Sequence, residues 1–385
     1  MGIHHDVLYS SLGEPTTRCC SQQALTQDIT LIEKTSRKKI VTLIITTCLM
    51  TSCGGGSSGN SSPSVPTNGN AVSEADETQD SGNTAIDTDP ICEEYRSETI
   101  VTDNQTAVEV SIKRCMMQHD GLDRSFYAYV PETYSNSTIN KPLLFSLHGY
   151  RSNALSHMRR TGFGEIASTE GFIVIYPQGS ILQSTGATHW NVGGWTNSST
   201  TDDVGFIKTI IQFMAINFRI DTDRIYSTGM SNGGFMSYHL ACNLGSKVAA
   251  IASVTGSMTI ETYEACGPDH PIPIMQIHGV KDDVVPYAGK SGRMKAIEDV
   301  IDYWSQNNRC DAIPDTEVLP DLNQDGSGGV KTSFMNCQNE VEVTLHLLDS
   351  MGHEWPLGDR HDLDAPSTIW QFLSRFNSYG MIDDD

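Results

Sequence analysis

The chain has 385 residues, with 25 Lys and Arg against 47 Asp and Glu, and its formal net charge is −22. This balance argues against a nucleic-acid-binding protein, because neutralising phosphate groups requires clustered basic side chains. No apolar run reaches the roughly 18 residues that a membrane-spanning helix needs, so a polytopic membrane protein is excluded.

The first part of the chain has the features of an export signal. A basic cluster at residues 37–39 precedes an eleven-residue apolar run at residues 40–50, which Thr51, Ser52 and Cys53 follow. A basic cluster, a short apolar run and small residues in this order are typical of a secretory signal. The position of Cys53 resembles the bacterial lipoprotein box, in which the cysteine is lipidated; the alternative is a plain signal peptide. Because 36 residues precede the basic cluster, we hypothesise that translation starts further downstream.

The next segment, residues 54–90, is rich in Gly, Ser and acidic residues and contains no aromatic residue, Lys or Arg. It cannot bury enough apolar surface to offset its chain entropy, so we expect a disordered linker. We therefore divide the chain into a lipoprotein-type export signal with an N-terminal extension (1–53), this linker and one catalytic domain (91–385). A lipid anchor on Cys53 predicts attachment to the outer membrane, and its absence predicts an extracellular protein.

Strand-like apolar runs alternate with amphipathic helices in residues 91–385. We predict buried strands at residues 142–148, 172–176, 224–227, 248–254 and 272–278, and a half-exposed strand at residues 341–347. Apolar residues recur at helical spacing over residues 204–218, and a second helix is predicted at residues 233–244. This alternation predicts an α/β fold whose central sheet is mostly parallel and covered by helices on both faces.

A candidate nucleophile lies between the predicted strand and the second helix. Gly229-Met230-Ser231-Asn232-Gly233 matches G-x-S-x-G. Glycines two residues either side of a serine leave room for a sharp turn that exposes its hydroxyl at the helix N-terminus. A serine needs a general base, and in α/β-hydrolases the acid and then the histidine follow the serine along the chain.

The candidate base is His353, which follows the last predicted strand on a loop between Gly352 and Pro356. Two other histidines fit that position less well, because His346 lies inside the strand and His361 lies in a polar stretch. We therefore predict that His353 takes the proton of the serine.

The candidate acid is Asp282, just past the predicted strand at 272–278, with Asp283 as the alternative. An acid at this point can accept the imidazole N–H and stabilise the imidazolium that forms. For the oxyanion hole we predict the backbone N–H groups of Asn232 and Tyr150, and we expect His148 to be a structural or pocket-lining group.

Three tryptophans could line a flat pocket for an aromatic or sugar-linked acid: Trp190, Trp195 and Trp355. The alternative for each is ordinary packing. The loop from Asp321 to Gly326 begins like a calcium-binding EF-hand loop, but Thr332 stands where Glu is needed, so we predict a solvated turn and no metal.

Ten cysteines without a CxxC pair are more than an ordinary cytosolic enzyme carries. Six follow Cys53, and an even number in an exported chain predicts disulfides. Pairing nearest neighbours gives the bridges Cys92–Cys115, Cys242–Cys266 and Cys310–Cys337.

Together these motifs resemble the polyhydroxybutyrate depolymerase/feruloyl esterase family of α/β-hydrolases, which includes acetyl xylan esterase-like members. The resemblance runs from about residue 124 to residue 376 and rests on Leu147-His148-Gly149, Tyr176-Pro177-Gln178-Gly179, Asp202 to Phe206, Gly229 to Gly234, His278-Gly279 with Asp282 and Val285-Pro286-Tyr287, and Gly352-His353 with Trp355-Pro356.

The resemblance implies a serine esterase with a Ser231–His353–Asp282 triad, an acyl-enzyme intermediate and no cofactor. We expect a monomer that acts on feruloyl or acetyl esters of plant polysaccharide. The alternatives are a depolymerase of polyhydroxybutyrate or related polyesters, a peptidase on the same fold, and a non-catalytic lipoprotein that binds glycan.

Overall fold

The computed structural model describes residues 87–101, 107–324, 326–358 and 360–382. The predicted export signal, Cys53 and almost all of the predicted linker lie outside these ranges. Within them, no helix combines the length and the apolar character needed to cross a membrane.

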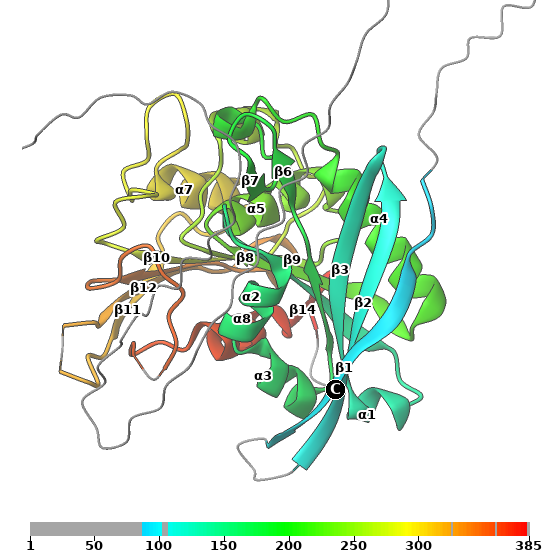
Figure 1. Ribbon diagram of the computed structural model, residues 1–385. Coiled ribbons are helices and arrows are strands. Elements are labelled where there is room, and N and C mark those ends of the chain that lie inside the picture. The colour runs from blue at the N-terminus through cyan, green and yellow to red at the C-terminus, as the bar shows by residue number, and fades with distance from the viewer. Residues whose placement is uncertain (1–86, 102–106, 325, 359, 383–385) are drawn as a thin grey trace, which may run out of the picture. The chain divides into compact units, whose positions relative to one another are not determined.

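One large sheet forms the centre of the fold (Figure 1). Its strands are β1 (Ile91–Val101), β2 (Ala107–His119), β3 (Leu122–Pro131), β4 (Lys141–Leu147), β5 (Ile173–Pro177), β8 (Ile220–Met230), β9 (Ala250–Val254), β10 (Ile274–Gly279), β11 (Asp315–Leu319), β12 (Gly329–Phe334) and β13 (Val343–Leu348). Their order is β1-β2-β3-β5-β4-β8-β9-β10-β13-β12-β11. The six strands from β5 to β13 in that order are parallel, and antiparallel strands extend the sheet at both edges.

Helices cover both faces of this sheet. They are α1 (Glu132–Ser135), α2 (Ala154–Arg160), α3 (Phe163–Glu170), α4 (Asp203–Asn217), α5 (Asn232–Leu244), α6 (Ile260–Ala265), α7 (Ile297–Asn307) and α8 (Ala365–Leu373), with short 3-10 turns at Gly194–Thr196 and Gln338–Glu340. Two small hairpins pair β6 (Ser180–Leu182) with β7 (Ala187–His189) and β14 (Phe376–Asn377) with β15 (Gly380–Met381). Helices α4, α5 and α7 pack on one face, and α2, α3 and α8 on the other (Figure 1). The predicted α/β-hydrolase fold is confirmed.

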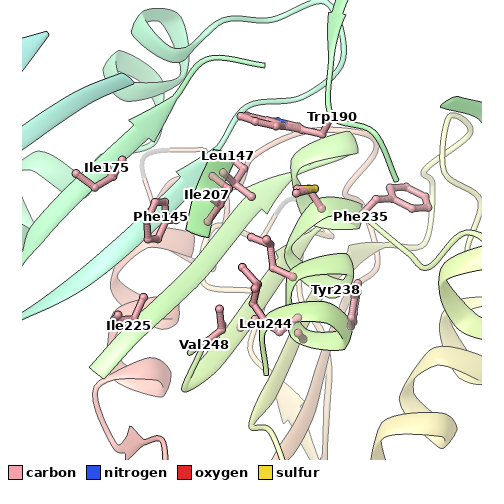
Figure 2. Close-up of a cluster of buried hydrophobic side chains, with 14 of the residues drawn as sticks. Phe145, Leu147, Ile175, Trp190, Ile207, Ile225, Phe235, Tyr238, Leu244 and Val248 are labelled. Atoms are coloured by element: carbon pink, nitrogen blue, oxygen red, sulfur yellow. The ribbon is translucent and has the colours of Figure 1, made fainter. Parts of the chain in front are cut away.

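Buried side chains on alternate positions of each central strand hold these layers together. On β4, Phe145 and Leu147 face α4 and α5, whereas Leu144 faces the opposite layer. Figure 2 shows Phe145 and Leu147 in one cluster with side chains of α5, including Phe235 and Leu244. Burying one such side chain stabilises the fold by about 1.5–3 kcal/mol. A strand buried on both faces needs a continuous apolar run, which is why the pattern of β4 does not alternate.

One predicted strand differs from its expected environment. The alternation at residues 341–347 predicted a half-exposed strand, but β13 is almost entirely buried. It pairs with β10 on one side and with the antiparallel β12 on the other, so it is an interior strand. The polar side chains of Thr344 and His346 are buried in this strand. The prediction of a half-exposed strand was wrong because both faces of β13 are covered. Val343 and Leu345 pack in the cluster that includes α7, and the alternate positions Thr344 and His346 are buried on the opposite face.

Three disulfides occur among the described residues, and they join the pairs predicted from the sequence. They are Cys92–Cys115, Cys242–Cys266 and Cys310–Cys337. The first links β1 to β2, and the second links α5 to the end of α6. The helix that begins at the G-x-S-x-G turn is therefore covalently tied to its neighbour.

Candidate active site

Ser231 lies on the turn between β8 and α5, where its backbone is strained. Its φ of 55° and ψ of −121° are unusual for a residue with a side chain. The turn is held because the Ser231 N–H donates to the Val254 carbonyl at 2.8 Å, and the Ser231 carbonyl accepts from the Phe235 N–H at 2.9 Å. The side chain therefore lies at the N-terminus of α5, where the helix dipole favours developing negative charge.

The two glycines of the motif are required by close backbone contacts. A Cβ atom at Gly233 would lie 2.0 Å from the Leu147 carbonyl oxygen, and one at Gly229 would lie 2.5 Å from the carbonyl carbon of Gly233. No side chain fits at either position without moving backbone. The glycines therefore allow β8, α5 and the end of β4 to meet beside Ser231.

Asp282 and His353 form a hydrogen-bonded pair. His353 Nδ1 lies 2.8 Å from Asp282 Oδ2, and the Asp282 carboxylate is buried. Because the carboxylate accepts at Nδ1, His353 Nε2 is left as a proton acceptor. The other oxygen, Asp282 Oδ1, accepts from the N–H groups of Val284 and Val285 at 3.0 and 2.8 Å. Burial raises the pKa of Asp282, but the hydrogen bonds from His353 and Val285 outweigh it, so the pKa is lowered and the carboxylate stays ionised.

The other acid and histidine candidates do not form such a pair. Asp283 is exposed, and His361 lies 3.5 Å from the Glu354 carboxylate instead. His346 is buried within β13. Among the described histidines, His278 is the other one near Asp282, at 3.8 Å, and its Nε2 donates to the Val285 carbonyl at 2.8 Å. His278 thus supports the loop that carries the acid.

The three predicted triad residues all follow the carboxyl ends of parallel strands. Ser231 follows β8, Asp282 follows β10 and His353 follows β13, and these strands lie within one stretch of the sheet. Ligands in open α/β sheets bind at this edge. Among the described hydrogen bonds, none joins the Ser231 hydroxyl to His353.

The predicted oxyanion donors lie on two elements beside the serine. Asn232 begins α5, and Tyr150 lies on the loop after β4. A Cβ atom at Gly149 would lie 3.5 Å from the Ser231 Cβ, so this loop runs against the nucleophile turn. The Tyr150 hydroxyl donates to Thr185 Oγ1 at 2.7 Å. The backbone around both N–H groups is thus near Ser231, as an oxyanion hole requires.

Two predicted substrate-binding residues are fully buried. His148 and Trp190 each have 0% exposed surface, so neither side chain is open to a substrate. Burial therefore agrees with the structural alternative given for His148 and with the packing alternative given for Trp190, and not with a pocket-lining role. Their types suggested contact with a ligand, but both polar rings are satisfied by hydrogen bonds inside the protein.

The other two tryptophans are half-buried. Trp195 packs edge-on against Tyr150 and Phe235, with ring centroids 5.5 and 6.2 Å apart. It therefore lies beside the candidate oxyanion loop and the first turn of α5. Trp355 packs edge-on against Phe163 at 5.9 Å, on the layer formed by α2, α3 and α8.

The loop from Asp321 to Gly326 contains a hydrogen bond between its two ends. Asp321 Oδ2 accepts from the Gly326 N–H at 2.9 Å, which closes the loop on itself. Asp325 lies outside the described residues. Within the described part of the chain, no group of three or more His, Cys, Asp or Glu side chains could hold a metal ion.

A buried ion pair near the site could not be found from the sequence. Arg124 Nη2 on β3 donates to Asp203 Oδ1 at 2.6 Å, and both side chains are buried. Asp203 Oδ2 also accepts from the Asn191 N–H at 2.7 Å, which anchors the segment that carries Trp190. Arg124 and Asp203 are 79 positions apart, and no spacing in a single sequence connects such residues.

Buried histidines are expected to make the protein less stable in acid. Burial lowers the pKa of four of them, to about 4 for His148, His239 and His346 and to about 3 for His157. In the unfolded chain a histidine titrates near a pKa of about 6.5, so the unfolded state binds more protons below that pH. The free energy of unfolding should therefore fall as pH drops from about 6.5 towards about 4, by at least about 3 kcal/mol.

Urea unfolding of the disulfide-intact protein at about pH 7 and about pH 4.5 measures this change. The comparison between about pH 7 and about pH 8.5 is the control, because these histidines are mostly neutral in both states there and the unfolding free energy should change far less. An unfolding free energy that is constant from neutral pH to about pH 4.5 would contradict the expectation.

The strand order and the position of Ser231 between β8 and α5 define this protein as an α/β-hydrolase. The chain belongs to the Esterase PHB depolymerase family, whose model matches residues 124–289.

The chain is also similar to several proteins that are named esterases. The bifunctional acetylxylan esterase/xylanase XynS20E of Neocallimastix patriciarum is 29% identical over 266 residues, covering 69% of this chain and 35% of that protein. Feruloyl esterase D of Neurospora crassa is 29% identical over 266 residues, covering 67% and 84% of the two chains. "Probable feruloyl esterase C" of Aspergillus terreus is 30% identical over 261 residues, covering 65% and 84%. The chain thus spans about a third of the bifunctional enzyme and most of the other two. The protein is a carboxylic ester hydrolase.

Proposed function

We propose that this protein is a serine esterase that hydrolyses feruloyl or acetyl esters of plant polysaccharide. Ser231 attacks the ester carbonyl while His353 takes its proton, and Asp282 orients the imidazole and stabilises the imidazolium. His353 then activates the water that releases the acid. The observation that carries the proposal is the 2.8 Å contact between Asp282 and His353 at the sheet edge where the strained Ser231 turn also lies.

We assign stabilisation of the oxyanion to the backbone N–H groups of Asn232 and Tyr150. Both belong to elements that meet at Ser231, because Asn232 follows it directly and the Gly149–Tyr150 loop runs against it. Donors fixed in this way stabilise the negative charge that develops on the carbonyl oxygen.

The choice of substrate rests on two observations. Two relatives that align with this chain over most of their length are named feruloyl esterases, one of them as probable. A third relative is named an acetylxylan esterase/xylanase. Next to the nucleophile turn, Tyr150, Trp195 and Phe235 form a series of edge-on aromatic contacts. Aromatic side chains offer a large apolar surface for a planar acid such as ferulate.

We also propose that the protein works outside the cytoplasm, as one catalytic domain (residues 91–385) joined by the linker to an export signal. The three disulfides support this location, because disulfides persist in oxidising compartments. A lipid anchor on Cys53 and a monomeric state complete the proposal.

A substrate panel tests the proposed function. The purified protein is expected to release ferulate or acetate from arabinoxylan and to hydrolyse p-nitrophenyl esters, with no hydrolysis of aminoacyl anilides. Chromatography of the released acids measures the first result. Faster release of hydroxybutyrate oligomers from polymer film than of either acid from arabinoxylan would reassign the protein to the polyesters. If a fluorophosphonate probe failed to label Ser231, a non-catalytic glycan-binding protein would replace the esterase.

A further inference from the structure

The backbone N–H and carbonyl of Trp190 are both hydrogen-bonded to the side chain of the residue that follows the nucleophile. The Trp190 N–H donates to Asn232 Oδ1 at 2.7 Å, and Asn232 Nδ2 donates to the Trp190 carbonyl at 3.1 Å. Both residues are fully buried. The side chain of the residue that follows Ser231 is therefore committed to a segment 42 positions away.

The indole of Trp190 makes a third hydrogen bond, to a different element. Its Nε1–H donates to the His148 carbonyl at 2.8 Å, directly before Gly149 and Tyr150. The rings of Trp190 and His148 also pack at 5.1 Å between centroids. In Figure 2 the Trp190 ring lies close to Leu147, the last residue of β4. One residue thus bridges the start of α5 and the loop after β4.

His148 extends this bridge. Its Nδ1–H donates to the Gly149 carbonyl at 2.8 Å, and its Nε2 accepts from the Gly179 N–H at 2.9 Å. Both bonds require the neutral ring with its proton on Nδ1. Burial lowers the pKa of His148 to about 4, so the ring holds that form at neutral pH. The two residues before Tyr150 are therefore fixed, His148 through its carbonyl and its ring and Gly149 through its carbonyl.

These contacts bear on the geometry of catalysis. The two N–H groups assigned to the oxyanion come from separate elements, Asn232 on α5 and Tyr150 on the loop after β4. Their separation is not set by the helix or the strand alone. A displacement of about 1 Å in such a group can cost about a hundredfold in rate.

We infer that Trp190 is a positioning residue that fixes the distance between the two oxyanion donors through Asn232 and the His148 carbonyl. This inference rests on the proposed function. According to this inference, Trp190 affects the rate of the reaction although it is buried and cannot contact the substrate. Hydrogen bonds that were only structural would affect stability without changing the stabilisation of the transition state.

Two variants separate these roles. Trp190→Phe keeps the ring and removes the indole donor, and it should lower kcat about tenfold with KM almost unchanged, since one such bond contributes up to about a factor of ten. Asn232→Ala keeps the backbone N–H and removes both bonds to the Trp190 peptide, and it should lower kcat by up to about a hundredfold. Because a boronic acid forms a tetrahedral adduct on serine, its affinity should fall by the same factor as kcat in each variant.

Trp304→Phe is the matched control. Trp304 is also fully buried, but its Nε1 has no hydrogen-bond partner among the described residues, and it lies on α7. This variant should change the thermal midpoint without changing kcat or boronate affinity. Equal kcat and boronate affinity in Trp190→Phe, Trp304→Phe and wild type would overturn the inference. A wild-type protein that hydrolyses no ester and binds no boronate would overturn the proposed function itself, and the inference with it.

Discussion

Ser231→Ala is expected to lower kcat for p-nitrophenyl acetate by about 10⁶-fold, because no acyl-enzyme can form without the hydroxyl. The remaining rate would come from the oxyanion donors and from substrate binding. Alanine fills the same backbone position, and both backbone hydrogen bonds of the turn remain possible. The loss should therefore occur with an unchanged circular dichroism spectrum.

The control for this variant is Ser291→Ala, at an exposed position on the turn before α7. It should keep the full kcat. If Ser231→Ala retained activity within about tenfold of wild type, another residue would be the nucleophile and the proposed mechanism would be wrong.

Asp282→Asn is expected to lower kcat by about 10⁴-fold through the tautomer of His353. The N–H groups of Val284 and Val285 point at Oδ1, so the amide oxygen of an asparagine should take that position. The amide NH2 then faces His353 Nδ1 and favours the ring with its proton on Nε2. A ring in that form cannot accept the serine proton.

Asp283→Asn provides the matched control, because it changes the same charge one residue away on an exposed side chain. It should leave kcat almost unchanged. Initial rates across pH, measured for both variants, check the expectation. A large loss in Asp283→Asn with activity kept in Asp282→Asn would assign the acid to the neighbouring position.

The parts of the fold that depend on local pattern could be predicted from the sequence. The apolar runs that form β4, β5, β9 and β10 were found because strands buried on both faces consist mostly of apolar residues. The turn at Ser231 was found because close backbone contacts demand glycines two residues away. The burial of β13 was missed because its alternate positions carry the polar side chains of Thr344 and His346, and alternation along one strand does not show whether its polar face is covered.

In the candidate site, too, residues placed by local pattern could be predicted, and residues whose role depends on distant partners could not. Asp282 and His353 could be proposed from their places after two strands, since parallel strands bring their carboxyl ends to one edge. The roles of His148 and Trp190 could not be predicted, because burial and partners decide them. Trp190 meets Asn232 and His148 across 42 residues of chain, and its residue type fits a pocket wall as well as a buried bridge.

The disulfide between Cys92 and Cys115 determines how the domain bears a mechanical load. These cysteines face each other in the register of β1 and β2, at the second residue of β1. Tension applied to the chain before Cys92 passes through the sulfur–sulfur bond into β2, an interior strand of the sheet. The rest of β1 carries none of that force, so its hydrogen bonds cannot be peeled open in sequence. A covalent path thereby bypasses an edge strand of the sheet.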